Sequence, residues 1–409
     1  MMKKVTTAII GGGAAGLFCA AHLDNTNSSV LVIERGERLG RKLSATGNGQ
    51  GNVTNTNFGA SHYFSFDESE RAKIQTVISK RDDKEMVAFL ESLGGLFQAD
   101  ERGRVYPTGR QASAVTDLLR FYLEKKGVGT SLSSKVTSIE KQEKGFLLTL
   151  EMQNGKEKIQ AENVVVCAGG KAAKNFGTDG TAYALVKPFS HTVTALYPAL
   201  VQIKTDIKEI KTLKGIRAFN AGVRAYQNKK LLAEVRGDVI FTEYGVSGDA
   251  IFRLSSYLTE IAENKTARIS IDFLPDVSAE KLQKTVESKA ENGGVFGELL
   301  CGILNNQIGR AVMKRAHNLS EVSFQAKNFT LDVTGTLGFD YAQVTKGGIP
   351  LKEVDENLQS KFCKGLYFAG EILDVDGECG GYNLQWAYSS ARAVAETINQ
   401  KSGKGGGQV

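Results

Sequence analysis

The chain opens with a short apolar run that stops at a cluster of glycines. Ala8 to Ile10 is apolar throughout and is followed at once by Gly11-Gly12-Gly13. Such a run predicts a buried parallel strand, and the alanine-rich stretch Ala14 to Leu23 predicts a helix. A second apolar run, Val30 to Ile33, ends at the acid Glu34. Strand, glycine turn, helix and strand in this order predict the first half of a nucleotide-binding α/β domain.

Farther along, short runs of alternating or continuous apolar residues predict more strands. These runs are Val136 to Glu140, Phe146 to Glu151, Lys156 to Ala161 and Asn163 to Cys167. Asn154-Gly155 is a typical hairpin dipeptide, so we expect the second and third of these strands to pair antiparallel. The first domain is thus expected to combine a parallel sheet with a small antiparallel section.

The pattern changes at about His191. From there strand-like segments dominate as far as Thr242 and predict a β-rich second domain. Helical periodicity between residues 251 and 319, interrupted by a predicted strand at Ile269 to Phe273, then predicts a helical insert. The expected organisation is an α/β nucleotide-binding domain of residues 1–190 and 346–400, a β-rich substrate domain of residues 191–250 and 320–345, the insert, and a disordered tail at 401–409.

Composition narrows the class of protein. Of 409 residues, 41% are hydrophobic and 23% are charged, as in ordinary globular proteins. The net charge of +6 comes from dispersed basic residues, so we expect no nucleic-acid partner and no membrane surface. The amino terminus runs straight into the first strand, without room for a cleavable signal, and the five cysteines are scattered; both favour the cytoplasm. The four histidines lack metal-ligand spacing, so no metal site is expected.

The glycine spacing in the first turn indicates a ligand. Gly11, Gly13 and Gly16 fit the dinucleotide-binding fingerprint, in which they permit the tight turn, the approach of a pyrophosphate and the packing of helix on strand. The helix N-terminus then offers N–H groups to the phosphates. Glu34 is placed to accept hydrogen bonds from a ribose. The alternative is a glycine-rich turn with no ligand.

The segment after Glu34, residues 35–57, has neither helical nor strand period. A segment of this kind in a compact domain is either disordered or wrapped on a ligand, and its place beside the glycine turn favours a ligand. Arg41 and Lys42 can meet a phosphate or an electron-rich ring, while Asn48 and Asn52 can donate and accept hydrogen bonds. A solvated basic loop is the alternative.

A second informative stretch lies near the carboxyl terminus. Leu366 to Phe368 predicts a short buried strand, and Gly370-Glu371 follows it. A glycine-dense loop, Asp374 to Gly381, then leads into a long amphipathic helix that begins near Asn383. Glu371 can bind the ribityl chain of a flavin, and the helix N-terminus can stabilise the negative charge of the reduced ring. An ordinary terminal helix is the alternative.

These motifs together resemble a known family. In chain order they are GGGAAG, GRKLSATGNGQGNVTN, GRVYP, VVVCAGG, IFTEYGVSGDAIF, VTKGGIPLKEVD and GLYFAGEILDVDGECGGYNLQWAYSSA. The series resembles the BaiN-like (YhiN-like) NAD(P)/FAD-dependent oxidoreductases, which include aminoacetone oxidases, over essentially the whole chain. The resemblance implies a discontinuous Rossmann-like FAD domain, a β-barrel-like domain and a small helical insert. Gln50-Gly51, Glu243 and Asp249 depart from the usual family motifs.

The resemblance also implies the residues that contact FAD. With Ala15 of the turn and Arg35 next to the acid, the expected contacts are Gly11, Gly13, Ala15, Gly16, Glu34, Arg35, Arg41, Lys42, Thr46, Gly47, Gly49, Asn52, Val136, Ala168, Gly169, Gly370, Glu371, Asn383 and Leu384.

The predicted activity is an FAD-dependent oxidation or reduction of a small molecule. Hydride would pass to or from flavin N5, with NAD(P)H as transient co-substrate or dioxygen as the other partner. A flavin-dependent RNA-modifying enzyme and a non-catalytic flavin sensor are the alternatives, and the chain is expected to be a monomer or homodimer. The catalytic candidates are Asn48, Glu243, Tyr244, Tyr382 and Trp386.

Overall fold

The computed structural model describes residues 2–26, 28–208, 210–262 and 266–404. The chain divides into two compact units. Unit 1 consists of Met1–Leu196 with Val344–Val409, and unit 2 is Tyr197–Gln343. Unit 1 therefore contains both the glycine turn near the amino terminus and the glycine-dense loop near the carboxyl terminus.

Unit 1 is organised around one sheet that is parallel in its centre. Its strand order is β7-β2-β1-β10-β9-β8, with β19 also paired to β10. The pairs β7–β2, β2–β1, β1–β10 and β10–β19 are all parallel, which confirms the predicted α/β class. The strands are β1 (Lys3–Ile10), β2 (Val30–Ile33), β7 (Gly129–Ser131), β8 (Lys135–Lys141), β9 (Phe146–Met152), β10 (Gly155–Val166) and β19 (Leu366–Phe368).

The long strand β10 joins two segments that the sequence predicted as separate strands. Its first half pairs antiparallel with β9, and its second half pairs parallel with β1. Ala161 lies in both ladders, opposite Phe146 on one side and Val5 on the other. The predicted hairpin is present, but Met152 pairs with Gly155, so the two turn residues are Gln153 and Asn154, one position earlier than expected.

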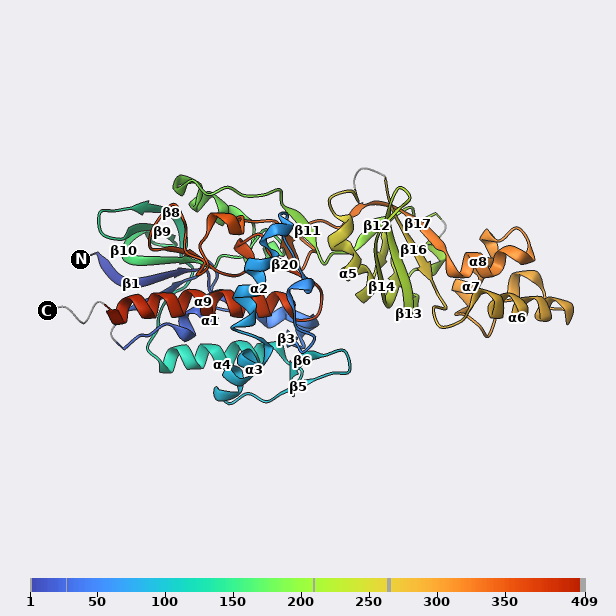
Figure 1. Ribbon diagram of the computed structural model, residues 1–409, viewed down its shortest axis with the longest axis horizontal. Coiled ribbons are helices and arrows are strands. Elements are labelled where there is room, and N and C mark those ends of the chain that lie inside the picture. Colours follow the sequence, from blue (N-terminus) through green and yellow to red (C-terminus); the bar gives the residue numbers. More distant parts are fainter. Residues whose placement is uncertain (1, 27, 209, 263–265, 405–409) are drawn as a thin grey trace. The chain divides into compact units, whose positions relative to one another are not determined.

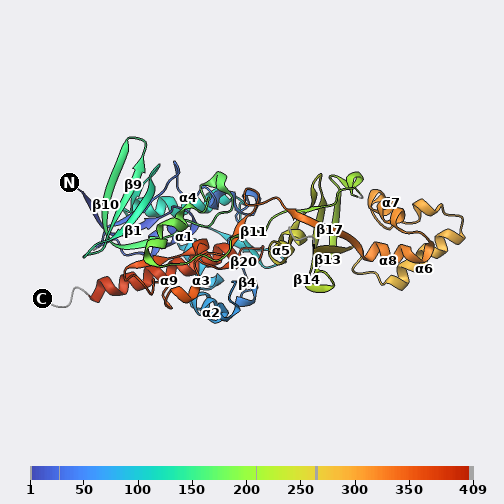
Figure 2. The same ribbon diagram turned by 90° about the horizontal axis from the view of Figure 1, so that it is seen from above.

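Helices cover this sheet, and two of them lie side by side although they come from opposite ends of the chain (Figures 1 and 2). These are α1 and the long α9, drawn in blue and red. Because α9 extends to Lys404, the predicted disordered tail is wrong for residues 401–404, and residues 405–409 lie outside the described residues. The helices are α1 (Ala14–His22), α2 (Arg71–Ser79), α3 (Asp83–Ser92), α4 (Ala112–Lys125) and α9 (Tyr382–Lys404).

Short strands complete unit 1. One small sheet has the order β3-β6-β5, and β4 pairs with β20. The β4–β20 pair matters for the site, because it ties the glycine-dense loop to a segment more than 300 positions earlier. The strands are β3 (Thr54–Asn55), β4 (Tyr63–Phe64), β5 (Phe97–Ala99), β6 (Arg104–Pro107), β18 (Val344–Lys346) and β20 (Asp376–Gly377).

Unit 2 contains a closed barrel in the order β12-β15-β14-β13-β16-β17. Alternate residues of its strands point inward, so that Val223, Ala225, Ile269 and Ile271 are buried. This barrel confirms the expected β-rich region. Its strands are β12 (Ile203–Thr205), β13 (Arg217–Gln227), β14 (Lys230–Phe241), β15 (Gly245–Ser247), β16 (Ala267–Asp272) and β17 (Phe329–Thr336), and β11 (Tyr197–Ala199) precedes them.

The helices of unit 2 divide into two sets, which corrects the predicted insert at 251–319. Helix α5 packs on β13 and β14, and β16 itself falls within the predicted insert, because the chain returns to the barrel there. Among the described residues, α6, α7 and α8 form the separate helical group, and all three are labelled in Figure 1. The helices are α5 (Asp249–Leu258), α6 (Ala279–Glu291), α7 (Asn306–Arg315) and α8 (Val322–Lys327).

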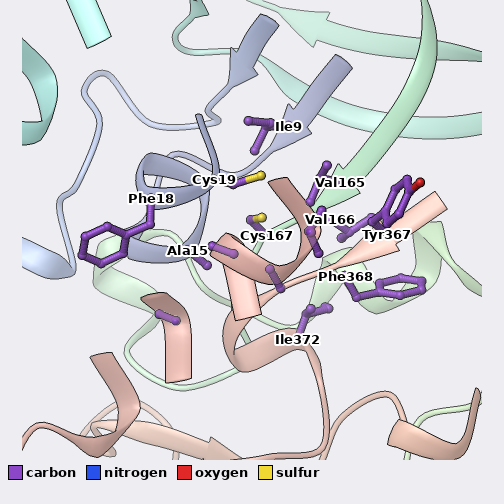
Figure 3. Close-up of a cluster of buried hydrophobic side chains, with 14 of the residues drawn as sticks. Ile9, Ala15, Phe18, Cys19, Val165, Val166, Cys167, Tyr367, Phe368 and Ile372 are labelled. Carbon is purple, nitrogen blue, oxygen red and sulfur yellow. The ribbon is translucent and has the colours of Figure 1, made fainter. Parts of the chain in front are cut away.

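A hydrophobic core packs between α1 and the sheet next to the glycine turn (Figure 3). Phe18 and Cys19 of α1 and Val165 of β10 have no exposed surface. Cys167, at the end of β10, is also buried, and burial holds the pKa of both thiols well above the ordinary value, with that of Cys19 at about 12. These cysteines therefore act as small apolar side chains that fill the space between helix and sheet.

Candidate flavin site

Four parallel strands of unit 1 end in one row across the sheet. The register places Ile10 beside both Ile33 and Val166, and Val166 beside Phe368. The loops that follow these residues therefore emerge at the same carboxyl edge. Ligands of open α/β sheets bind at this edge, so the structure assembles a nucleotide-type site from segments far apart in the sequence.

The first turn shows a separate role for each of three glycines. Gly11 has a φ of +104°, and a Cβ there would lie 2.5 Å from the carbonyl oxygen of Cys167. A Cβ on Gly16 would lie 1.9 Å from the carbonyl oxygen of Gly11, so this glycine permits α1 to pack on the turn. At Gly13 an added Cβ would meet no protein atom within 4 Å. Gly13 is thus the position of the turn that is open to a ligand.

Glu34 is held in place by two backbone donors. Its Oε2 accepts a hydrogen bond from the Gly12 N–H at 2.7 Å, and its Oε1 accepts one from the Gly36 N–H at 2.7 Å. Each carboxylate oxygen has a second lone pair, so a ribose hydroxyl can still be bound. Ser134 donates its N–H to the Glu34 carbonyl at 2.9 Å, which brings the start of β8, and with it Val136, toward the same end of the site.

The next loop makes a tight left-handed bend. Residues Leu43–Gly49 form a short 3-10 segment that is interrupted at Thr46, Gly47 and Asn48. Gly47, Gly49 and Gly51 have φ values of +58°, +83° and +78°, and Asn48 shares this conformation at +53°. The aperiodic sequence of this loop is explained by these left-handed residues, because they exclude both helix and strand. A Cβ on Gly49 would meet no protein atom within 4 Å.

Two residues of this loop serve the fold more than the ligand. The side-chain amide of Asn52 donates to the carbonyls of Thr54 and Val105, at 2.9 and 3.0 Å, and is buried. Thr46 donates its hydroxyl to the Leu43 carbonyl at 2.7 Å. Both side chains therefore fix the path of the loop, and their predicted contacts with FAD would have to come from remaining acceptor atoms or the backbone.

The basic residues of the loop have protein partners. Lys42 forms an ion pair with Glu371 at 2.7 Å, and the other oxygen of Glu371 accepts the N–H of Thr345 at 2.8 Å. Arg41 donates to the carbonyl of Asn175 at 2.8 Å, and Arg35 pairs with Asp179 at 2.8 Å. The segment after Gly169 thus lies across the basic loop and is fastened to it.

The carboxyl-terminal segment closes the site from the other side. A Cβ on Gly370 would lie 2.7 Å from the Cβ of Ala15, so this loop packs on the first turn of α1. Asn383 spans the loop before α9, because its side chain accepts the Gly377 N–H at 2.8 Å and donates to the Gly377 carbonyl at 2.7 Å. Leu384 packs against the core. These contacts hold the glycine-dense loop against the start of α9 and the Gly370 loop against the first turn of α1.

The catalytic candidates fall in different surroundings. Trp386 is 1% exposed and donates its indole N–H to the Gly370 carbonyl at 3.2 Å, so burial removes it from the groups that can touch a substrate. Tyr382 is 4% exposed; its hydroxyl donates to the Asn57 carbonyl at 2.9 Å and its ring stacks on His62. Asn48 is exposed in unit 1. Glu243 and Tyr244 belong to unit 2, where Glu243 forms an exposed ion pair with Lys214.

Two buried groups near Glu371 were not predicted. Asp374 is 1% exposed, and burial raises the pKa of its carboxyl to about 6. Tyr183 is 4% exposed; burial and then the charges of Glu371 and Asp374 raise the pKa of its phenol. The acid in the otherwise apolar run Ile372 to Val375 was the available signal for Asp374. No pattern in the sequence marked Tyr183.

The donor set and the open positions fit FAD. Gly13 and Gly49 leave room for a ligand at two points of one edge, and N–H groups at the start of α1 have no side-chain cap. Among the described residues, no group of three or more His, Cys, Asp or Glu side chains is placed to hold a metal ion. Every helix in the described part of the chain is too short or too polar to cross a membrane.

Known proteins resemble this chain over nearly its full length. The family model described as the HI0933-like protein Rossmann domain matches residues 5–397. The 3-dehydro-bile acid delta(4,6)-reductase of Clostridium scindens is 34% identical over 95% of this chain and 98% of that protein. The ribosomal RNA dihydrouridine synthase of Escherichia coli is 30% identical over 97% of this chain and 98% of that protein.

Solved flavoenzymes share the fold. The 3-ketosteroid delta1-dehydrogenase of Sterolibacterium denitrificans has a TM-score of 0.55 at 12% identity, covering 98% of this chain and 100% of that one. A flavocytochrome c3 fumarate reductase has a TM-score of 0.53 at 14% identity, covering 97% and 78%. Together with the matched family, the fold confirms the resemblance noted from the motifs. The chain belongs to the HI0933-like Rossmann-domain family of FAD-dependent oxidoreductases.

Proposed function

We propose that this protein uses FAD to reduce a carbon–carbon double bond that is conjugated to a carbonyl group in a small organic molecule, with NAD(P)H as the reductant. One observation carries the proposal. Two kinds of full-length relative act on different substrates, and their names describe the same chemical change.

The shared chemistry follows from the two names. A 3-dehydro-delta(4,6) bile acid has a ring ketone conjugated with its double bonds. Conversion of uridine to dihydrouridine saturates the ring double bond next to a carbonyl. In both cases hydride adds to the carbon distant from the carbonyl and a proton adds to the neighbouring carbon. Bound FAD would supply the hydride, and the protein supplies binding, orientation and electrostatics.

Different residues at the carboxyl edge would bind different parts of the cofactor. The open turn at Gly13 and the first N–H groups of α1 would bind the pyrophosphate, and Glu34 would bind the adenosine ribose. Glu371, oriented by Lys42 and by the Thr345 N–H, would bind the ribityl chain. The left-handed loop at Gly47 to Gly49 and the start of α9 would border the ring system.

The charge distribution of unit 2 favours a small molecule over RNA. Several arginines on its barrel strands are already neutralised by acids, in the pairs Arg217–Asp238, Arg224–Glu234, Arg236–Asp276 and Arg268–Asp332. A surface that binds a phosphate backbone needs cations free to replace counterions. The higher identity to the bile acid reductase than to the RNA-modifying relatives agrees with this preference.

The test begins with the visible spectrum of the purified protein under anaerobic conditions. We expect a flavin spectrum that bleaches with NADH or NADPH and returns on addition of a 3-oxo-4-ene steroid, with the saturated ketone as product. Gly13→Val provides a control without flavin. Recovery with ribosomal RNA but with no small enone would overturn the substrate class, and recovery only in air would indicate an oxidase. A flavin that no nicotinamide reduces and no substrate reoxidises would indicate a sensor.

A further inference from the structure

Asp374 is a buried carboxyl group with an incomplete set of hydrogen bonds. Its Oδ2 accepts the N–H of Phe66 at 3.2 Å and the hydroxyl of Ser65 at 3.3 Å. Its Oδ1 is buried and has no hydrogen-bond partner among the described residues. An ionised carboxylate in this position is poorly solvated, so its neutral form is accessible near neutral pH.

The location of Asp374 connects it to the cofactor site. It lies three positions after Glu371, in the loop that packs on the first turn of α1 through Gly370. Its N–H donates to the carbonyl of Ile349 at 2.8 Å, and the neighbouring strand β20 pairs with β4. The main chain of Asp374 is thus held by backbone hydrogen bonds on both sides, and its carboxyl group is buried.

The charged and titratable groups around Asp374 come from several elements. Lys346, at the end of β18, lowers the pKa of its carboxyl, and Asp67 raises that pKa. The buried phenol of Tyr183 faces both Asp374 and Glu371. Glu371 itself is paired with Lys42, so its charge is compensated. Between Asp374 and Tyr183, Asp374 has the accessible proton, because burial keeps the phenol of Tyr183 neutral.

We propose that Asp374 takes up a proton when the flavin is reduced and releases it when the flavin is reoxidised, so that the net charge of the site stays constant. Hydride transfer from NAD(P)H adds two electrons and one proton, and leaves the cofactor with one more negative charge. That charge favours protonation of a nearby buried carboxyl, and the proton comes from solvent. When hydride passes on to the substrate, Asp374 returns its proton to solvent, which balances the proton added to the substrate carbon.

Asp374 acts on the cofactor through its charge and not by contact, so it is a positioning residue for the redox step. The inference rests on the proposed placement of FAD beside Glu371, but it does not depend on the substrate. It can therefore be tested by electrochemical reduction with no substrate present. The result can be interpreted even if no substrate of the protein is found.

The experiment measures the midpoint potential of the bound flavin against pH. Each proton taken up with two electrons adds about 30 mV per pH unit to the slope. Above pH 6, Asp374 is expected to be ionised while the flavin is oxidised. We therefore expect the slope of the wild-type protein to include one such additional proton, and the slope of Asp374→Asn to lack it. Asp83→Asn, which changes another buried acid at the start of α3, is the matched control and should keep the wild-type slope.

Two further measurements test whether Asp374 is the group that takes up the proton. Tyr183→Phe should retain the additional slope, and loss of the slope in this variant would overturn the assignment to Asp374. If Asp374→Asn does not retain flavin, infrared difference spectra of the wild-type protein labelled with ¹³C-aspartate replace it. Reduction should then produce a band from a protonated aspartic acid. An unchanged slope in Asp374→Asn, or no such band, would contradict the proposal.

Discussion

The Lys42 ammonium lies 2.7 Å from a carboxylate oxygen of Glu371, although 329 positions separate the two residues in the chain. This ion pair joins the left-handed loop near the amino terminus to the loop before α9. Both side chains are mostly buried, with 24% and 18% of their surface exposed. The pair therefore orients Glu371 at the edge where the strands end.

Breaking this pair should weaken FAD binding. We expect Lys42→Met and Glu371→Gln each to raise the Kd for FAD, with a coupling energy of roughly 1–2 kcal/mol in the double-mutant cycle, because the two side chains act as one unit. Reconstitution of apoprotein with FAD, followed by fluorescence quenching, measures these constants. Lys214→Met breaks a highly exposed pair with Glu243 and should leave the Kd unchanged. Strictly additive effects of the two substitutions would show that the pair is unimportant.

Substitutions in the glycine turn should separate binding from folding. Gly13 has a φ of −78°, which any residue adopts, and a Cβ there meets no protein atom. Gly13→Val should therefore fold, with an ordinary circular dichroism spectrum and thermal transition, but should lose FAD. Gly16→Val should fail to fold, because its Cβ would overlap the Gly11 carbonyl. Full flavin content in purified Gly13→Val would contradict this division of roles.

We expect the free energy of unfolding to decrease below pH 6.5 because of His22. Burial lowers the pKa of this histidine from 6.5 to about 4, so the unfolded chain takes up its proton first as the pH falls. The stabilisation present above pH 6.5 is lost as the pH falls toward 4, by about 2 kcal/mol at pH 5. Urea unfolding of His22→Phe at pH 7 and pH 5 should show a smaller difference than in the wild-type protein. The exposed His317 provides the control, since His317→Gln should keep the full pH dependence.

We expect Trp386 to stabilise the loop at Gly370 and not to take part in catalysis. Trp386→Phe removes the N–H that donates to the Gly370 carbonyl, and we expect a loss of about 1–3 kcal/mol of stability with faster release of FAD. The rate of hydride transfer per bound flavin should remain close to that of the wild-type protein. Tyr388 lies in the same helix as Trp386, and its hydroxyl donates to Glu85 of α3; Tyr388→Phe removes this bond and should lower stability without affecting flavin release. A large fall in the hydride-transfer rate of Trp386→Phe would restore it as a catalytic candidate.

Local patterns were sufficient to predict much of the cofactor edge. The apolar runs that end at Gly11, Glu34, Cys167 and Ala369 are continuous buried strands, and a fully apolar run has few alternatives in a parallel sheet. Two predictions failed at boundaries. The two strands expected at Lys156 to Ala161 and Asn163 to Cys167 form the single strand β10, because it changes partners from β9 to β1, and the strand expected within the insert, β16, belongs to the barrel.

The sequence by itself determined the glycine turn, the parallel strands and the carboxyl-terminal helix, because these depend on neighbours only a few positions apart. The tertiary structure decided which polar groups face one another. Lys42 forms an ion pair with Glu371, and the indole N–H of Trp386 donates to the Gly370 carbonyl. Asp374, next to the paired strands β4 and β20, is buried with one carboxylate oxygen that has no hydrogen-bond partner among the described residues. Burial and charge pairing arise from segments brought together across hundreds of positions, and no local spacing records them.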